Sequence, residues 1–166
     1  MKRAGTMFLV IYRLLAGAIV AAAAAVVLLL LLGFHPYAVR TGSMEPTVPT
    51  GSLCFVNRRT AFEEIQAGDI VAFRMGELMV IHRAVRISGA GITTKGDANS
   101  AEDAEANVTQ ANYIGKTVFW IPGVGKVLLF VHTGSGRFAA AGAIALFLAA
   151  GVVYDKIKAR YKTTEA

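Results

Sequence analysis

The chain has 166 residues, 55% of them hydrophobic, and a formal net charge of +6. Most of the excess charge lies at the two ends, because the segment 35–137 holds ten basic and nine acidic residues. A nearly neutral middle leaves no basic stripe to bind phosphates, which argues against a nucleic-acid-binding protein. The single cysteine, Cys54, excludes an intrachain disulfide and a cysteine-based metal site.

The first predicted element is an apolar helix over residues 14–34, a run of 21 residues without a charge. Such a helix is about 32 Å long, enough to cross a hydrocarbon core of about 30 Å. A basic start also precedes cleavable signal peptides, but this run is long for one and no small-x-small motif ends it. We therefore interpret residues 1–13 as a cytoplasmic tail and residues 14–34 as a retained transmembrane anchor.

Residues 35–137 predict a small, irregular, mainly antiparallel β domain. Short runs rich in β-branched and aromatic residues, separated by Gly, Asp or charged turns, indicate strands. These runs cover residues 52–57, 69–74, 78–86, 91–95 and 113–121. The polar stretch 58–69 breaks the pattern and fits one helical turn. The segment 120–131 fits either a membrane-interface segment that carries Trp120 or a hairpin of the β core.

The second apolar run, residues 138–154, has 17 residues and is at the lower limit for a span. A buried helix of a soluble domain is the alternative. The run is apolar on all sides and a basic tail, residues 155–166, follows it, which favours a second transmembrane helix. Basic residues flank both runs, so we expect both ends in the cytoplasm and residues 35–137 on the extracytoplasmic side. The expected fold class is a mainly β domain flanked by two transmembrane helices.

The sequence "TGSMEPTVPTGS", residues 41–52, builds a turn around Ser43 directly after the anchor. Its two prolines restrict φ to about −65° and hold the loop still. We expect Met44 to offer a flexible apolar surface to lipid or to an apolar substrate segment. Hydrolysis by a side chain needs a nucleophile, a base and a group that orients the base. Ser43, the strand residue His82 and either Asp97 or Asp103 supply that set.

Each of these residues alone has a simpler explanation, as a turn residue, a locally bonded histidine or a solvated acid. The combination of serine, histidine and aspartate is stronger evidence for a catalytic set than any one of these residues. No lysine occurs between Lys2 and Lys95, so His82 is the natural base for Ser43. Their order along the chain is no obstacle, because geometry defines such triads. Asn107 begins a glycosylation-acceptor pattern that often arises by chance.

The sequences "TGSMEPTVPTGS", "AGDIVAF", "VIHRAV" and "TKGDANSAED" together resemble type I signal peptidases. The branch is the one of the endoplasmic reticulum, archaea and some Gram-positive bacteria, and the resemblance covers nearly the whole chain. It implies Ser43 as nucleophile, His82 as general base and Asp103 as the preferred acid, with Asp97 as a supporting residue. It also implies that Thr41, where serine is commoner, joins the Ser43 N–H in stabilising the oxyanion.

The resemblance implies a membrane-bound serine endopeptidase that cleaves signal peptides after small-x-small sites, without a metal or organic cofactor. Its partners would be the signal peptides of exported preproteins, docked as an extended strand on a sheet edge, the lipid bilayer, and other subunits or the secretion translocon. The enzyme would be located in the cell membrane, or in the endoplasmic reticulum membrane in a eukaryote. The alternative is a non-catalytic membrane subunit that scaffolds an export or pilin-like assembly, which has no need of a complete Ser/His/Asp set.

Overall fold

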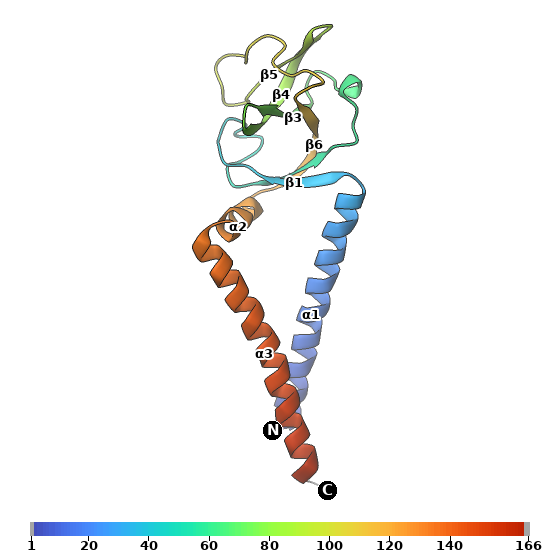
Figure 1. Cartoon of the computed structure of the whole chain (residues 1–166), viewed down its shortest axis with the longest axis vertical. Helices are drawn as coiled ribbons and strands as arrows, with labels where there is room; N and C mark the ends of the chain where they lie inside the picture. The colour runs from blue at the N-terminus through green and yellow to red at the C-terminus, as the bar shows by residue number, and fades with distance from the viewer. Residues whose placement is uncertain (1, 165–166) are drawn as a thin grey trace. The chain divides into compact units, whose positions relative to one another are not determined.

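The computed structural model describes residues 2–164, and the chain divides into two compact units. One unit is helical and comprises the residues before 27 and after 129. The other unit, residues 27–129, contains the whole β sheet and is called the β unit. The elements, labelled in Figure 1, are α1 (Lys2–Leu31), β1 (Phe34–Ala38), β2 (Leu53–Asn57), η1 (Phe62–Glu64), β3 (Ile70–Met75), β4 (Leu78–Ser88), β5 (Gly91–Lys95), β6 (Tyr113–Ile121), α2 (Val124–Val131) and α3 (Gly134–Thr164).

Two long helices, α1 and α3, each contain a stretch that is long and apolar enough to cross a membrane, judged by length and composition. These stretches are Leu9–Leu31 in α1 and Gly134–Tyr154 in α3. Helix α1 starts before the predicted residue 14. It ends before the predicted residue 34 because Gly33 has a φ of +92°, which is not helical, and β1 starts at the next residue.

Helix α3 is longer than the predicted run 138–154 at both ends. At its start, the Thr133 hydroxyl oxygen accepts a hydrogen bond from the Gly136 N–H at 3.0 Å, as an N-cap does. Within the helical unit, the Tyr12 and Phe147 rings stack with centroids 4.7 Å apart. A side chain at Gly151 would meet the Tyr12 hydroxyl at 2.5 Å, so glycine makes room for that ring.

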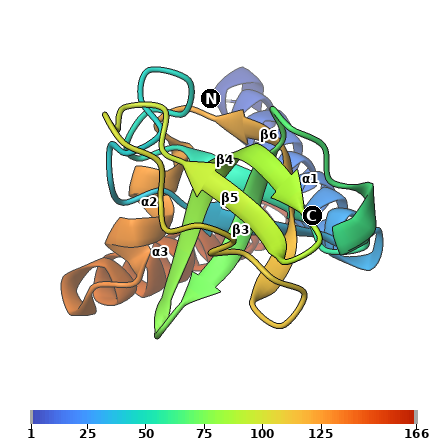
Figure 2. The same ribbon diagram turned by 90° about the horizontal axis from the view of Figure 1, so that it is seen from above.

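The sheet has six strands, all antiparallel, in the order β1-β2-β6-β3-β4-β5. Figure 2 shows β3, β4 and β5 side by side at one end of that order. The mainly β fold and the five predicted strands are confirmed, each strand to within two residues. Strand β1 was not predicted from the sequence; it begins at Phe34, the last residue of the predicted anchor. It contains Pro36, which an edge strand tolerates because, among residues 2–164, only one of its sides pairs with another strand.

Strand β3 carries two cores, one on each face. Its residues 70–73 are all buried, and successive side chains of a strand point to opposite faces. Val71 and Phe73 pack in one cluster, with Ile65, Ala84, Ile92 and Val108. Ile70 packs in the other, with Met44, Val48 and Cys54. A central strand covered on both faces explains why this run lacks the apolar–polar alternation of a half-exposed strand.

The segment 120–131 does not form a hairpin, so that alternative is wrong. Strand β6 ends at Ile121, Pro122 lacks the N–H that a further pairing needs, and Gly123 has a φ of +78°. Helix α2 follows directly. Trp120 packs against the cluster around Cys54. The helical turn expected within residues 58–69 is present as η1.

Gly115 of β6 is a position where the sheet leaves no room for a side chain. A Cβ there would overlap the carbonyl oxygen of Asn57 in β2 and come within 2.8 Å of Val56 Cγ1. We expect Gly115→Ala to destabilise the β unit by about 1–3 kcal/mol, the usual cost of overpacking. Thermal unfolding in detergent, followed by circular dichroism, measures this. The control is Gly89→Ala, where nothing lies within 4 Å of the new Cβ; equal midpoints for the two variants would contradict the prediction.

Candidate active site

The loop that carries Ser43, residues 41–52, is called the serine loop, and the burial of its apolar side chains anchors it. Met44 is only 2% exposed and Val48 is fully buried, and both pack against Cys54 and Ile70. The expectation that Met44 faces lipid or substrate is therefore wrong. Its side chain points into the core, and because Met44 follows Ser43 directly, its burial holds the backbone of Ser43 against the sheet.

Hydrogen bonds within the loop add to that anchor. The Glu45 carboxylate accepts hydrogen bonds from the Thr50 backbone N–H at 3.1 Å and from the Thr50 hydroxyl at 2.7 Å. These bonds lower the pKa of Glu45 below its ordinary value. The Val48 N–H donates to the Met44 carbonyl at 2.8 Å. The loop is thus closed on itself, with Ser43 near its start.

A second loop, residues 96–103 after β5, holds Ser43 from the other side. The Ala98 N–H donates to the Ser43 carbonyl oxygen at 2.9 Å. A Cβ on Gly96 would lie 2.6 Å from the same oxygen, so this close approach requires glycine. The backbone of Ser43 is therefore fixed by two parts of the chain that lie far apart in sequence.

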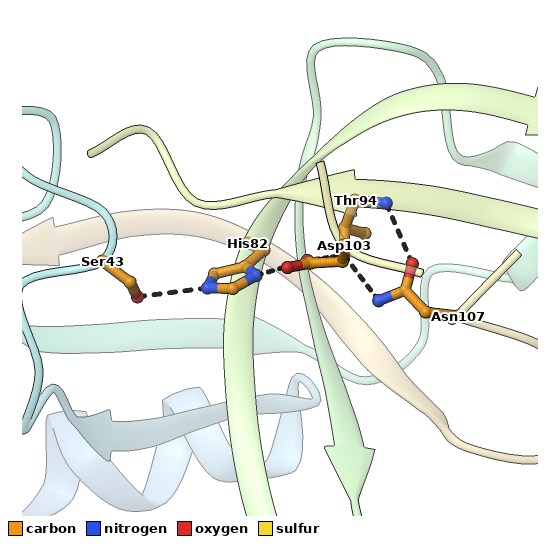
Figure 3. A network of polar contacts seen from close by, with 5 residues as sticks. All are labelled: Ser43, His82, Thr94, Asp103 and Asn107. Carbon is orange, nitrogen blue, oxygen red and sulfur yellow. Dashed lines mark hydrogen bonds and ion pairs between the residues drawn. The ribbon is translucent and has the colours of Figure 1, made fainter. Parts of the chain in front are cut away.

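His82 lies near the middle of β4, opposite Val71 of β3, and is 8% exposed. Phe73 meets its ring edge-on, with centroids 6.2 Å apart. As Figure 3 shows, the imidazole lies between two oxygens: Nε2 is 3.1 Å from Ser43 Oγ, and Nδ1 is 2.6 Å from Asp103 Oδ2. A rigid strand thus places one imidazole in contact with both a hydroxyl and a carboxylate.

Asp103 is positioned by β5. Its backbone N–H donates to the Thr94 carbonyl at 2.8 Å, and its Oδ2 accepts the Thr94 hydroxyl at 2.6 Å. A carboxylate only accepts hydrogen bonds, so the neutral His82 carries its proton on Nδ1 and turns the lone pair of Nε2 toward Ser43. An imidazole in that tautomer can take the proton of a serine hydroxyl.

The second acid, Asp97, forms an ion pair with Arg83. Arg83 donates from Nε at 2.8 Å and from a terminal nitrogen at 2.6 Å, and its other terminal nitrogen donates to the Gly68 carbonyl at 2.7 Å. These hydrogen bonds hold the pKa of Asp97 below its usual value, and a hydrogen bond from Thr47 adds to the effect. The same ion pair raises the pKa of Arg83. Of the two candidate acids, Asp103 is the one bonded to the imidazole.

Three threonines belong to the candidate site or to the parts of the chain that support it. Thr41 is exposed, two residues before the serine, and its role in oxyanion binding stays a prediction. Thr47 joins the serine loop to Asp97, and Thr94 joins β5 to Asp103. Neither of the latter two was singled out from the sequence.

Asn107 is a further residue that the sequence analysis did not assign to the site. Its Nδ2 donates to Thr94 Oγ1 at 2.8 Å, and its Oδ1 accepts from the Thr94 N–H at 3.0 Å (Figure 3). The sequence marked it only as a glycosylation-acceptor pattern. No local signal points to its contact with Thr94, since the two residues meet only when the chain after β5 folds back.

Comparison with known proteins identifies the family of the chain. A family model described as "Signal peptidase, peptidase S26" matches residues 12–119. Three fungal relatives, each named signal peptidase complex catalytic subunit SEC11, align over 105 residues, which are 56% of this chain and 61% of each relative. They come from Pyricularia oryzae, Sclerotinia sclerotiorum and Verticillium alfalfae and are 36%, 37% and 35% identical to this chain.

The chain thus spans about 61% of the length of the curated relatives it matches. The matched range of the family model includes Ser43, His82 and Asp103 and takes in most of the chain. The chain belongs to the signal peptidase family, peptidase S26.

Proposed function

We propose that this chain is a membrane-bound serine endopeptidase that removes N-terminal signal peptides from exported proteins. The observation that carries the proposal is the alignment of the Ser43 hydroxyl and the Asp103 carboxylate on the two nitrogens of the His82 imidazole, each within hydrogen-bond distance of the ring. The names of the relatives, catalytic subunits of a signal peptidase complex, support the same activity. A scaffolding subunit would have no use for this alignment.

The mechanism follows from the direction of the hydrogen bonds. His82 Nε2 takes the proton of Ser43 as Oγ attacks the carbonyl carbon of the scissile bond. The protonated imidazole then gives that proton to the leaving amine, and an acyl-enzyme remains. Water, activated by the same imidazole, hydrolyses the acyl-enzyme. Asp103 keeps the ring oriented throughout, and the Ser43 N–H and Thr41 stabilise the oxyanion.

Asp97 supports this site without entering the reaction. Its ion pair with Arg83 and its hydrogen bond with Thr47 link β4 to the serine loop. The Ala98 N–H, one residue later, holds the Ser43 carbonyl. The acid thus stabilises the loop contact that keeps Ser43 beside His82.

The substrates are signal peptides of preproteins, with small side chains at the first and third positions before the cut. They dock as an extended strand on an edge of the sheet, where unpaired backbone groups are available. The partners are the lipid bilayer and further subunits or the secretion translocon. The reaction uses groups of the chain itself and a water molecule, and it needs no metal or organic cofactor.

The helices α1 and α3 cross the membrane, with both tails in the cytoplasm and the β unit on the extracytoplasmic side. Basic residues beside the apolar stretches support this orientation. The membrane is the cell membrane, or that of the endoplasmic reticulum in a eukaryote. Helix α2, with Val124, Val127 and Phe130 exposed, lies at the membrane interface, where an apolar face is favourable.

Replacing Ser43 by alanine tests the activity itself. Ser43→Ala removes the nucleophile, and we expect the rate of signal-peptide cleavage to fall at least about a thousandfold. The assay follows a preprotein with the purified chain in detergent and in its own membranes. Ser100→Ala, at an exposed serine, is the matched control and keeps full activity. Undiminished cleavage by Ser43→Ala, or none by the unaltered protein in either preparation, would refute the proposal.

Replacing Asp97 by asparagine tests its supporting role through the pH dependence of stability. Because the fold lowers the pKa of Asp97, the ion pair stabilises the protein above the unfolded value of about 4 and is lost as pH falls through the folded value. We expect Asp97→Asn to cost about 1 kcal/mol at neutral pH, allowing for solvent screening. That difference from the unaltered protein should shrink in acid.

The measurement is the free energy of unfolding of both proteins at neutral pH and below pH 4. Glu102→Gln provides the control, because Glu102 and Arg86 form an ion pair with both side chains largely exposed and contribute little at any pH. A difference that does not vary with pH would rule out the ion pair as the stabilising interaction of Asp97.

The orientation is tested by protease protection in bacterial spheroplasts. A protease site inserted in the β3–β4 turn, between Gly76 and Glu77, should be cut from outside. A tag after residue 166 should be spared until the membrane is permeabilised. Cleavage of the tag in intact spheroplasts would mean that α3 does not cross the membrane in the proposed direction.

A further inference from the structure

We propose that Asn107 is a positioning residue of the active site, and this inference rests on the function proposed above. Its side-chain amide turns the Thr94 hydroxyl toward Asp103. The carboxylate that orients His82 thereby gains a second hydrogen-bond donor. Figure 3 shows Ser43, His82 and Asp103 in a row, with Thr94 beside Asp103 and Asn107 at the end away from Ser43.

The donors and acceptors leave only one arrangement of this network. The Thr94 backbone N–H can only donate, so the atom of Asn107 facing it at 3.0 Å is the oxygen Oδ1. The amide nitrogen Nδ2 therefore faces Thr94 Oγ1, at 2.8 Å, and must donate to it. The hydroxyl accepts at that side, and its own proton is left for Asp103 Oδ2 at 2.6 Å.

Burial makes the hydrogen bonds of this network difficult to replace. Thr94 is fully buried, so water cannot replace a lost partner at its hydroxyl. Asp103 Oδ2 accepts from both Thr94 and His82 Nδ1. Two donors on one oxygen fix the position of the carboxylate relative to the imidazole. Hydrogen bonds to a charged group are among the stronger ones in proteins, which is why one donor matters here.

The backbone around Asn107 is built to hold that amide in place. On one side, the Ala106 N–H donates to the Thr93 hydroxyl at 3.1 Å. On the other, Val108 is fully buried and exchanges two backbone hydrogen bonds with Ile92 of β5, at 2.8 and 3.0 Å. The Asn112 amide donates to the Asn107 carbonyl at 2.9 Å. Ala106 has a φ of +48°, a left-handed conformation that these anchors maintain.

The nitrogen that serves the site is also the one that glycosylation would modify. Asn107, Val108 and Thr109 match the acceptor pattern, but Nδ2 of Asn107 donates to Thr94. A glycan on that nitrogen would break the hydrogen bond, so the two uses exclude each other. The geometry assigns Asn107 to the network.

The test uses Asn107→Asp in the full chain, with a preprotein as substrate. Aspartate has nearly the same shape and still accepts from the Thr94 N–H, but it cannot donate, so Thr94 turns its proton away from Asp103. We expect kcat to fall roughly tenfold, the effect of one hydrogen bond to a charged group. Asn107 lies beyond Asp103 from Ser43, so KM should stay within about twofold. Gln66→Glu, at an exposed glutamine, controls for the added charge and keeps its activity.

A double variant shows whether Asn107 acts through Thr94. Thr94→Val removes the hydroxyl at constant shape and should lower kcat by a similar factor, while Thr94→Ser should retain most of it. Adding Asn107→Asp to Thr94→Val should cause little further loss, because the hydroxyl through which Asn107 acts is gone. If the losses of kcat in the two single variants multiply in full in the double variant, the inference is overturned. It is also overturned if Asn107→Asp leaves kcat unchanged.

Two further readings keep the outcomes distinct. Unfolding midpoints are measured for every variant. Where Asn107→Asp is too unstable to assay, Thr94→Ser is compared with Thr94→Val. Equal activity of these two variants overturns the inference. Ser43→Ala is run in the same assay. Cleavage by Ser43→Ala would overturn the proposed function, whereas an inactive Ser43→Ala beside a fully active Asn107→Asp would overturn this inference alone.

Discussion

The 3.1 Å contact between Ser43 Oγ and His82 Nε2 joins two residues 39 positions apart, and the other contacts of the site serve to keep it. His82 is carried by a strand in the interior of the sheet order. Ser43 is carried by a loop, which lacks the backbone hydrogen bonds that hold a strand in its sheet. The loop gains its rigidity from the buried Met44 and from the Ala98 N–H on the Ser43 carbonyl. Ordering a loop costs conformational entropy, and apolar burial beside the serine offsets that cost.

One loop, residues 96–103, supplies an acid to each of two adjacent residues of β4. Neighbouring side chains of a strand point to opposite faces, so His82 and Arg83 take different partners. Asp103 bonds to His82, and Asp97 bonds to Arg83. The two aspartates differ in what their partners do: the first faces a ring that takes and returns a proton in the proposed reaction, and the second faces a permanent cation. The single loop thus joins the chemistry of the site to the stability of the serine loop.

The limits of prediction are clearest at Thr94. The hairpin between β4 and β5 pairs Ser88 with Gly91 and Arg86 with Thr93, and counting on from the turn would pair Thr94 with Val85. A bulge between Ala84 and Arg86 shifts the register by one residue, so Thr94 pairs with Ala84 instead. Ala84 shares a face with His82, whereas Val85 does not. A one-residue shift reverses which face a side chain occupies, and no pattern in the sequence marks this bulge.

The sequence by itself determined the two apolar helices, five of the six strands and the residue types able to act together, because helix length, strand periodicity and turn residues are local properties. It did not indicate that Met44 is buried, that Pro36 lies in an edge strand, or that Asn107 contacts Thr94. Those outcomes depend on which segments pack together after the chain folds. Tertiary structure alone decided that Asp103 rather than Asp97 bonds to the imidazole, since both acids lie in one loop and only the register of β4 with β5 places one of them behind the ring.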